Sequence, residues 1–88
     1  MPHYVYMLKT INGKHNKTYV GYTNNLKKRV ELHNKGKGAK STKGHKWLLI
    51  YYERYSSKNE ALQNEYSLKN NYNLRQKIKK IYLKTNEK

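Results

Sequence analysis

The sequence contains no cysteine, no phenylalanine and no aspartate among its 88 residues. The lack of cysteine excludes disulfides, disulfide-linked partners and thiolate metal sites. The lack of aspartate excludes a Ser-His-Asp set, and five glutamates are too few for most two-metal nuclease sites, which need several clustered carboxylates. No apolar run reaches transmembrane length, and the N-terminal residues lack the layout of a signal peptide. We therefore expect a cytoplasmic protein without a membrane partner.

Positive charge and tyrosine are what the chain has in excess. Twenty lysines and arginines against five glutamates give a net charge of +15 and a pI near 10.0. Such a charge on so small a body implies a polyanionic partner, and nucleic acid is favoured over a membrane because no basic amphipathic helix stands out. Ten tyrosines and one tryptophan supply the aromatic side chains, so a thin core must place tyrosine hydroxyls at the surface or against partners.

Hydrophobic periodicity and turn residues predict the element order β-β-α-β-α-α. Strands over 3–10 and 17–22 flank the turn signal Asn12-Gly13 and form a hairpin. The other predicted elements are a helix capped by Thr23, Asn24 or Asn25 and ended at Gly36, a basic loop over 35–46, a strand over 47–54, a helix from the capping box Ser57-x-x-Glu60 to Lys69, and a short helix over 74–83 capped by Asn73. We expect an α/β (α+β) fold with a small three-stranded antiparallel-type sheet flanked by helices.

One domain is expected over residues 1–83, followed by a basic disordered tail over 84–88. No internal repeat and no linker divides the chain. A monomer is the default expectation for the oligomeric state.

Glu65 lies at an inward position of its predicted helix, on the stripe of Ala61 and Leu68. A carboxylate on an inward stripe must be paired, bound to a metal or placed at the edge of a cleft, because burying it alone is costly. Pairing with a nearby lysine or arginine and a functional role are equally open from the pattern.

Arg29 and His33 raise the same question on the first predicted helix, where they flank Val30 one turn apart. An inward arginine needs an anion, either Glu65 or a phosphate from outside, unless its aliphatic stem merely covers the core. A lone histidine on such a face is more often a hydrogen-bonded core residue than a proton carrier.

Tyr6 and Tyr19 come from the two strands of the predicted hairpin and share one face of the sheet. Packing is the usual role of tyrosines on a hairpin. Gly21, on the same face as Tyr19, leaves one position bare and admits close approach by a ligand or by backbone.

The loop over 35–46 is rich in glycine and lysine but lacks the spacing of a phosphate-binding P-loop, and it leads from a helix into a strand rather than the reverse. Contact with a nucleic-acid backbone is favoured over a purely solvated loop. The predicted nucleic-acid-binding residues are Lys35, Lys37, Lys40, Lys43 and Lys46.

Four features in order resemble the GIY-YIG nuclease superfamily: "YVY" at 4–6, "YVG" at 19–21, Arg29 ten residues beyond Tyr19, and a helix carrying Glu65. The runs "HNKGKGAKSTKG" and "EALQNEYSLK" are similar to its small stand-alone bacterial proteins, which also resemble the N-terminal nuclease domain of the excision-repair incision subunit. The likeness covers residues 3–75. Each motif alone is weak, and the four together at these spacings are specific.

The resemblance implies a metal-dependent phosphodiesterase whose catalytic residues are Tyr6, Tyr19, Arg29, His33 and Glu65. Glu65 would hold one divalent ion, Mg²⁺ or Mn²⁺, with waters and substrate phosphate completing the oxygen shell. Arg29 would bind the charge of the transition state, and Tyr6 or Tyr19, aided by His33, would orient or deprotonate the attacking water. The departures from the family pattern are Tyr-Val-Tyr in the first motif, Tyr22 in place of a lysine, and an assisting asparagine with three possible matches, Asn70, Asn71 and Asn73.

These features favour an endonuclease acting on DNA in repair or recombination. We expect dependence on structure or on single strands, with little sequence specificity. The alternative is a catalytically inactive nucleic-acid-binding module of the same fold. A basic protein associated with RNA or the ribosome is a third hypothesis.

Overall fold

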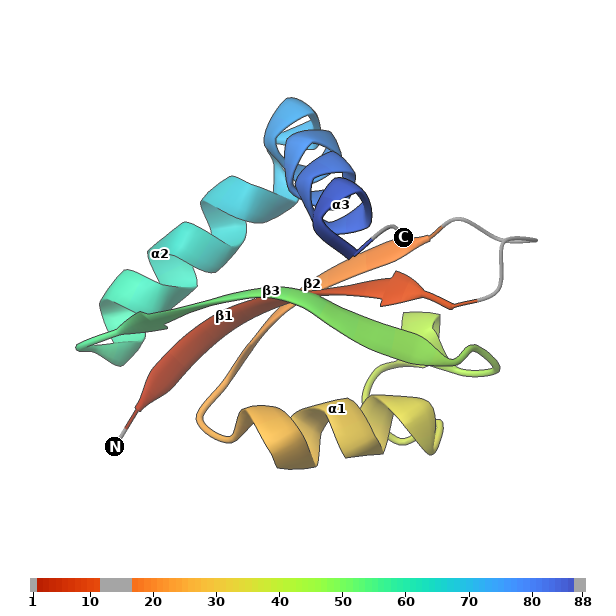
Figure 1. The fold of residues 1–88 in the computed structure, drawn as a ribbon. Helices are drawn as coiled ribbons and strands as arrows, with labels where there is room; N and C mark the ends of the chain where they lie inside the picture. The colour runs from red at the N-terminus through yellow and green to blue at the C-terminus, as the bar shows by residue number, and fades with distance from the viewer. Residues whose placement is uncertain (1, 12–16, 87–88) are drawn as a thin grey trace.

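The computed structural model describes residues 2–11 and 17–86 (Figure 1). Their element order confirms the prediction and the α+β class, with one short 3-10 helix that was not predicted. The elements are β1 (His3–Thr10), β2 (Thr18–Thr23), α1 (Leu26–Asn34), the 3-10 helix η1 (Lys40–Thr42), β3 (Trp47–Tyr55), α2 (Lys58–Lys69) and α3 (Tyr72–Asn86). The predicted Asn12-Gly13 turn falls outside the described residues.

The three strands form one antiparallel sheet in the order β2-β1-β3, so β1 is the central strand. In the β1–β2 pairing, Tyr6 lies opposite Gly21 and Leu8 lies opposite Tyr19. The pairing of β1 with β3 shifts register between Met7 and Leu8. This arrangement confirms the predicted hairpin and the predicted three-stranded sheet.

Alternation along the strands builds two separate cores, one on each face of the sheet. On one face, Val5, Met7 and Val20 pack with residues of α2. On the other, Tyr6 and Leu8 pack with Trp47, and the first helix adds Leu26 and Val30. Figure 1 shows α1 below the sheet and α2 and α3 above it. Arg29 and Glu65 therefore come from helices on opposite faces of the sheet.

Polar side chains cap the starts of α1 and α2, and a glycine ends α1. Asn25 caps α1 by accepting a hydrogen bond from the backbone N–H of Lys28 at 3.2 Å. Gly36 has a φ of 77° and ends the helix as predicted, because its left-handed backbone suits a residue without a side chain. Ser57 caps α2 by accepting from the N–H of Glu60 at 3.1 Å, which confirms the predicted start.

Helix α3 is longer than predicted at both ends. The cap is Asn71 rather than Asn73, because its side-chain oxygen accepts from the N–H of Leu74 at 3.0 Å. The helix begins at Tyr72 and continues to Asn86, so residues 84–86, expected in a tail, are helical. Ile78, inside the predicted range, packs against the same core cluster as α2.

Candidate active site

Tyr6 is a fully buried residue on the central strand, with its ring on the α1 face of the sheet. Gly21, opposite it on β2, makes room for this ring. A Cβ atom at Gly21 would lie 2.4 Å from the hydroxyl oxygen of Tyr6, closer than real side-chain contacts allow. The space left by the missing side chain of Gly21 is therefore occupied by the ring of Tyr6.

The hydroxyl of Tyr6 joins two residues of α1. It lies 2.7 Å from His33 Nε2, and it accepts a hydrogen bond from Arg29 Nε at 3.3 Å. A guanidinium can only donate, so the phenolic hydrogen goes to His33 Nε2. That nitrogen must then be unprotonated, which makes Tyr6 the donor to His33 and the acceptor from Arg29.

His33 is fully buried, and both of its ring nitrogens have partners. Its Nδ1 lies 2.9 Å from the hydroxyl of Thr42, and its ring centroid is 4.8 Å from that of Tyr19. Burial, followed by the charge of Arg29, lowers the pKa of His33, so the imidazole is neutral at physiological pH. His33 is therefore a hydrogen-bonded core residue, which is the more common role for a lone histidine on the inward face of a helix.

The guanidinium of Arg29 is held at two points. In addition to its bond to Tyr6, one terminal nitrogen donates to the carbonyl oxygen of Gly38 at 3.1 Å. The hydrogen bond to Tyr6 is the largest cause of a raised pKa for Arg29. A phenol and a carbonyl are neutral, so these bonds orient the guanidinium without cancelling its charge.

Tyr19 lies at the edge of this group and is only half-buried. Its ring centroid is 6.3 Å from that of Tyr6. Burial raises the pKa of Tyr6 to about 12; the charges of Tyr19 and Glu65 act in the same direction, while Arg29 opposes them. Of the two tyrosines predicted for catalysis, Tyr19 is the one that reaches solvent.

Glu65 is not paired with Arg29 in the described structure. It forms an ion pair with Lys69, one turn further along α2, at 3.6 Å, and its side chain is 19% exposed. Its charge nevertheless contributes to raising the pKa of Tyr6. Pairing with a lysine was one of the two alternatives left open by the sequence.

The donor chemistry around Glu65 suits only a lightly held metal. Among the described residues, no three His, Cys, Asp or Glu side chains are grouped closely enough to hold a metal ion. A single carboxylate that solvent reaches fits Mg²⁺ or Mn²⁺, because such hard ions keep several waters and take further oxygens from a phosphate. It would not fit a metal that requires a closed cage of protein ligands.

The five lysines predicted to bind nucleic acid are all exposed. Three of them, Lys37, Lys40 and Lys43, line a hollow of about 410 Å³ together with backbone of 36–39. Gly38, whose carbonyl holds Arg29, lines the same hollow. The loop thus carries positive charge directly beside the Tyr6, Arg29 and His33 group.

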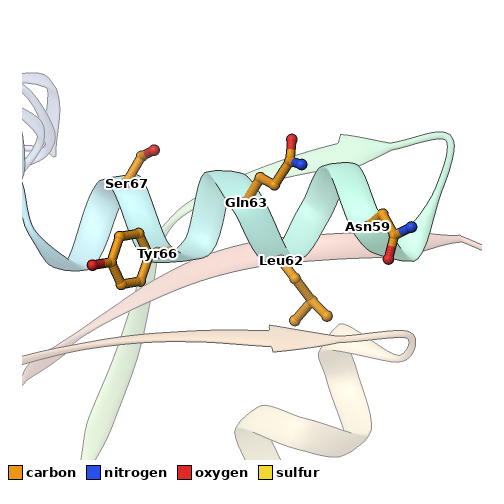
Figure 2. Close-up of a pocket in the computed structure, with 5 residues that line it drawn as sticks. All are labelled: Asn59, Leu62, Gln63, Tyr66 and Ser67. Atoms are coloured by element: carbon orange, nitrogen blue, oxygen red, sulfur yellow. The ribbon is translucent and has the colours of Figure 1, made fainter.

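A second hollow, of about 490 Å³, lies along α2 (Figure 2). Its lining consists of Asn59, Leu62, Gln63, Tyr66 and Ser67. In Figure 2, Gln63 and Ser67 point to one side of the helix and Leu62 to the other, and Leu62 is exposed. None of the predicted catalytic or nucleic-acid-binding residues lines this hollow, so its size does not make it the candidate active site.

Sequence reasoning missed Gly38 and Thr42. Gly38 packs against His33 so closely that a Cβ atom there would lie 2.3 Å from Nδ1. Thr42 is fully buried and bonds to the same nitrogen. Both residues lie in a polar, lysine-rich stretch without hydrophobic periodicity, which gives no sign of a buried position.

The chain matches a known protein family over most of its length. The family model described as the GIY-YIG catalytic domain matches residues 2–79. The chain belongs to the GIY-YIG family. This confirms the resemblance carried by Tyr6, Tyr19, Arg29 and Glu65.

Bacterial relatives in the GIY-YIG family match nearly the whole chain. A UPF0213 protein of Staphylococcus haemolyticus is 46% identical over 80 residues, which are 90% of this chain and 93% of that protein. The UPF0213 protein YazA of Bacillus subtilis is 46% identical over 82 residues, covering 92% and 77% of the two chains. The solution NMR structure of a UPF0213 protein from Bacillus halodurans is 36% identical, covers 99% of this chain and 89% of that one, and superposes with a TM-score of 0.52.

GIY-YIG membership makes this a nuclease-type domain, and a nuclease domain binds nucleic acid. GIY-YIG nucleases in general depend on divalent metal ions. Over residues 2–11 and 17–86, no helix combines the length and apolar character needed to cross a membrane.

Proposed function

We propose that this protein is a divalent-metal-dependent endonuclease that hydrolyses phosphodiester bonds in DNA. We further propose dependence on DNA structure or on single strands, little sequence specificity, and a role in DNA repair or recombination in the cytoplasm. The observation that carries the proposal is the pair of hydrogen bonds by which Tyr6 and Gly38 hold the guanidinium of Arg29. Binding alone is served by exposed cations, whereas a guanidinium oriented in advance suits charge that develops during a reaction.

Arg29 is the residue that contacts the transition state in this proposal. Its charge is unneutralised by its two hydrogen-bond partners, and its planar fork matches two oxygens of a phosphate. The bonds to Tyr6 and Gly38 fix the fork before substrate arrives. Little reorganisation is then needed when negative charge grows on the phosphate oxygens.

Tyr19 is the tyrosine that would contact the attacking water. Tyr6 and His33 are fully buried, whereas Tyr19 is half-buried beside them. We assign Tyr6 and His33 the task of holding Arg29 and the ring of Tyr19 in place. Tyr19 would orient the water through its hydroxyl and take part in removing its proton.

Glu65 would hold the divalent ion, because its ion-pair partner Lys69 lines one hollow together with Tyr19, which places the carboxylate near the tyrosine that solvent reaches. The ion, when bound, neutralises charge on the phosphate and on the leaving oxygen. Lys69 would release the carboxylate at that point, because a divalent cation attracts it more strongly than the single charge of the ammonium group. The neighbouring lysine loop would bind the backbone on one side of the cleaved bond.

A catalytically inactive nucleic-acid-binding module is the alternative. The ion pair between Glu65 and Lys69 favours it, because an ammonium group already neutralises the carboxylate. Both functions predict binding of nucleic acid, but only the endonuclease predicts cleavage of the bound strand.

Labelled single-stranded, double-stranded and branched DNA, with RNA of the same sequence, tests the proposal. Each substrate is incubated with the protein with Mg²⁺, with Mn²⁺ and with EDTA. We expect cleavage of DNA with either metal and none with EDTA, and more on single-stranded or branched DNA than on the duplex. Binding to all substrates without cleavage of any would support the inactive module. Cleavage of RNA alone would overturn the assignment of DNA.

A further inference from the structure

Thr42 is a buried polar residue at the end of the 3-10 helix η1. Its side-chain oxygen accepts from the N–H of Ala39 at 3.2 Å and lies 2.9 Å from both the carbonyl oxygen of Ala39 and Nδ1 of His33. No part of the residue is exposed. A single hydroxyl hydrogen must therefore be assigned to one of two acceptors, the carbonyl or the imidazole.

The hydrogen-bond inventory around His33 decides this assignment. Tyr6 needs an acceptor for its phenolic hydrogen, and His33 Nε2 is that acceptor, so Nε2 carries no proton. In a neutral imidazole the other nitrogen then carries it, and Nδ1–H donates to the hydroxyl oxygen of Thr42. The hydroxyl hydrogen of Thr42 is left for the carbonyl of Ala39. Every donor in this series of hydrogen bonds, from Tyr6 to Ala39, then has one acceptor.

We infer that Thr42 is a positioning residue that fixes the tautomer of His33, and through it the orientation of the Tyr6 hydroxyl and of Arg29. With the opposite tautomer, Nε2–H would donate to the phenolic oxygen of Tyr6 beside the bond from Arg29 Nε, and Nδ1 would have to accept from Thr42. The Tyr6 hydrogen would lose its acceptor, and a buried polar group without a partner costs about 1–3 kcal/mol. By accepting from Nδ1–H, Thr42 thus selects the tautomer in which the Tyr6 hydrogen has an acceptor and the phenolic lone pairs face Arg29.

The same segment also holds Arg29 directly. Trp47 donates from its indole nitrogen to the carbonyl of Thr42 at 2.9 Å, which anchors η1 to the start of β3. The backbone of Gly38 packs on the imidazole of His33 and accepts from Arg29. The lysine-rich loop over 35–46 and the hydrogen-bonded residues Arg29, Tyr6 and His33 therefore pack as one unit. Thr42 belongs to the loop and bonds to His33, so it connects the two.

A simpler role for Thr42 is that its hydroxyl only closes the turn of η1 through Ala39. Thr42→Ser keeps the hydroxyl, and Thr42→Val keeps the shape but removes it, so both roles predict a lower melting temperature for the valine variant. Only the positioning role predicts a change at His33. Thr10→Val is the matched control, because Thr10 is also a buried threonine whose hydroxyl accepts a backbone N–H, that of Lys17 at 3.1 Å.

Long-range ¹H–¹⁵N NMR spectra of histidine-labelled protein read the tautomer directly. They are recorded at pH 8, and His33→Gln assigns the signal among the four histidines. We expect a protonated Nδ1 and a bare Nε2 at His33 in the wild type, in Thr42→Ser and in Thr10→Val. In Thr42→Val the Nε2–H tautomer should become populated, and the Arg29 Nε–H should exchange with solvent at least tenfold faster. Thr42→Ala serves the same purpose if the valine variant does not fold.

A protonated Nε2 in the wild type would overturn the inference, and so would an unchanged tautomer in folded Thr42→Val. This measurement does not depend on nuclease activity, so it stands even if the proposed function fails. The further expectation that Thr42→Val cuts DNA about tenfold more slowly, with rescue by Thr42→Ser, rests on the proposed function. Absence of cleavage by the wild type would refute that function and leave the tautomer result in place.

Discussion

Arg29 Nε donates to the hydroxyl oxygen of Tyr6 at 3.3 Å, which ties the first helix to the central strand of the sheet. Tyr6 is fully buried, whereas Arg29 is half-buried and reaches solvent. The hydrogen bond therefore anchors a solvent-accessible arginine to a rigid, buried residue. The carbonyl of Gly38 provides the second fixed point. Oriented charge at the surface of a rigid sheet is the physical basis of the proposed activity.

Arg29→Lys should lower the cleavage rate on the order of a hundredfold, about 2.7 kcal/mol, with affinity for DNA little changed. Lysine keeps the charge but cannot bond to Tyr6, to Gly38 and to a phosphate in one plane. Single-turnover rates and binding titrations separate the two effects. Arg54→Lys, on the exposed part of β3, is the matched control and should behave as the wild type. A normal rate in folded Arg29→Lys would assign Arg29 to packing.

Tyr6→Phe and Tyr19→Phe should have different consequences, although each removes only a hydroxyl. Tyr6→Phe leaves Nε2 of His33 buried without a donor and should destabilise the fold by about 1–3 kcal/mol. Tyr19→Phe should leave the melting temperature nearly unchanged while lowering the rate of cleavage, because Tyr19 is half-buried. Thermal unfolding and cleavage are measured on the same samples. Equal losses of stability in both variants would contradict the separate roles.

Much of the fold was predictable because its signals are local. Three local signals each act within a few residues: the alternation of β1 side chains between the two faces of the sheet, the glycine that ends α1 and the serine that starts α2. The structure confirms all three. Helix α3 begins earlier than predicted because Asn71 and Asn73 are equally suitable caps by residue type, and the hydrogen bond to the N–H of Leu74 is made by Asn71.

Residue spacing and strand alternation predicted only part of the candidate site. The sequence placed Tyr6 and Tyr19 on one face and predicted Arg29 near them, and the described structure agrees. It could not tell that Glu65 comes from the opposite face, because strand order and helix placement are set by long-range packing. Thr42 escaped notice because a buried hydroxyl in a polar loop has no periodic signature.

Stability should fall as the pH drops below 6.5, because the folded protein keeps His33 neutral. The pKa of His33 is lowered in the fold from 6.5, so its contribution to stability is full above that pH. It is lost as the pH falls through the folded-state pKa, since the unfolded chain then binds the proton more readily. Denaturant unfolding at pH 8.0 and at lower pH measures the effect. His33→Gln should flatten this dependence, and an unchanged slope in that variant would assign it to another group.

Binding to DNA should weaken steeply with salt, because the exposed lysines of the loop release counterions. If the five loop lysines neutralise about five phosphates, log K should fall with log[salt] at a slope of roughly −3.5 to −4.5. Replacing Lys37, Lys40 and Lys43 by glutamine should reduce the slope by about 2 to 3. The matched control replaces three exposed lysines of α3, Lys77, Lys80 and Lys84. Equal changes in both triple variants would mean that the loop has no special part in binding.

Cleavage of labelled DNA by Glu65→Gln, with and without Mg²⁺, tests the central claim most directly. We expect the variant to bind DNA as the wild type does, to remain folded and to cut none, since the amide keeps the size of the side chain and only the ion pair with Lys69 is lost. Glu53→Gln is the control, because Glu53 is exposed on β3 and acts on Tyr51 and Tyr55 rather than on Tyr6. Loss of metal-dependent cleavage in Glu65→Gln alone is the predicted result. Wild-type cleavage by Glu65→Gln, or its loss in Glu53→Gln instead, would contradict the proposed metal site.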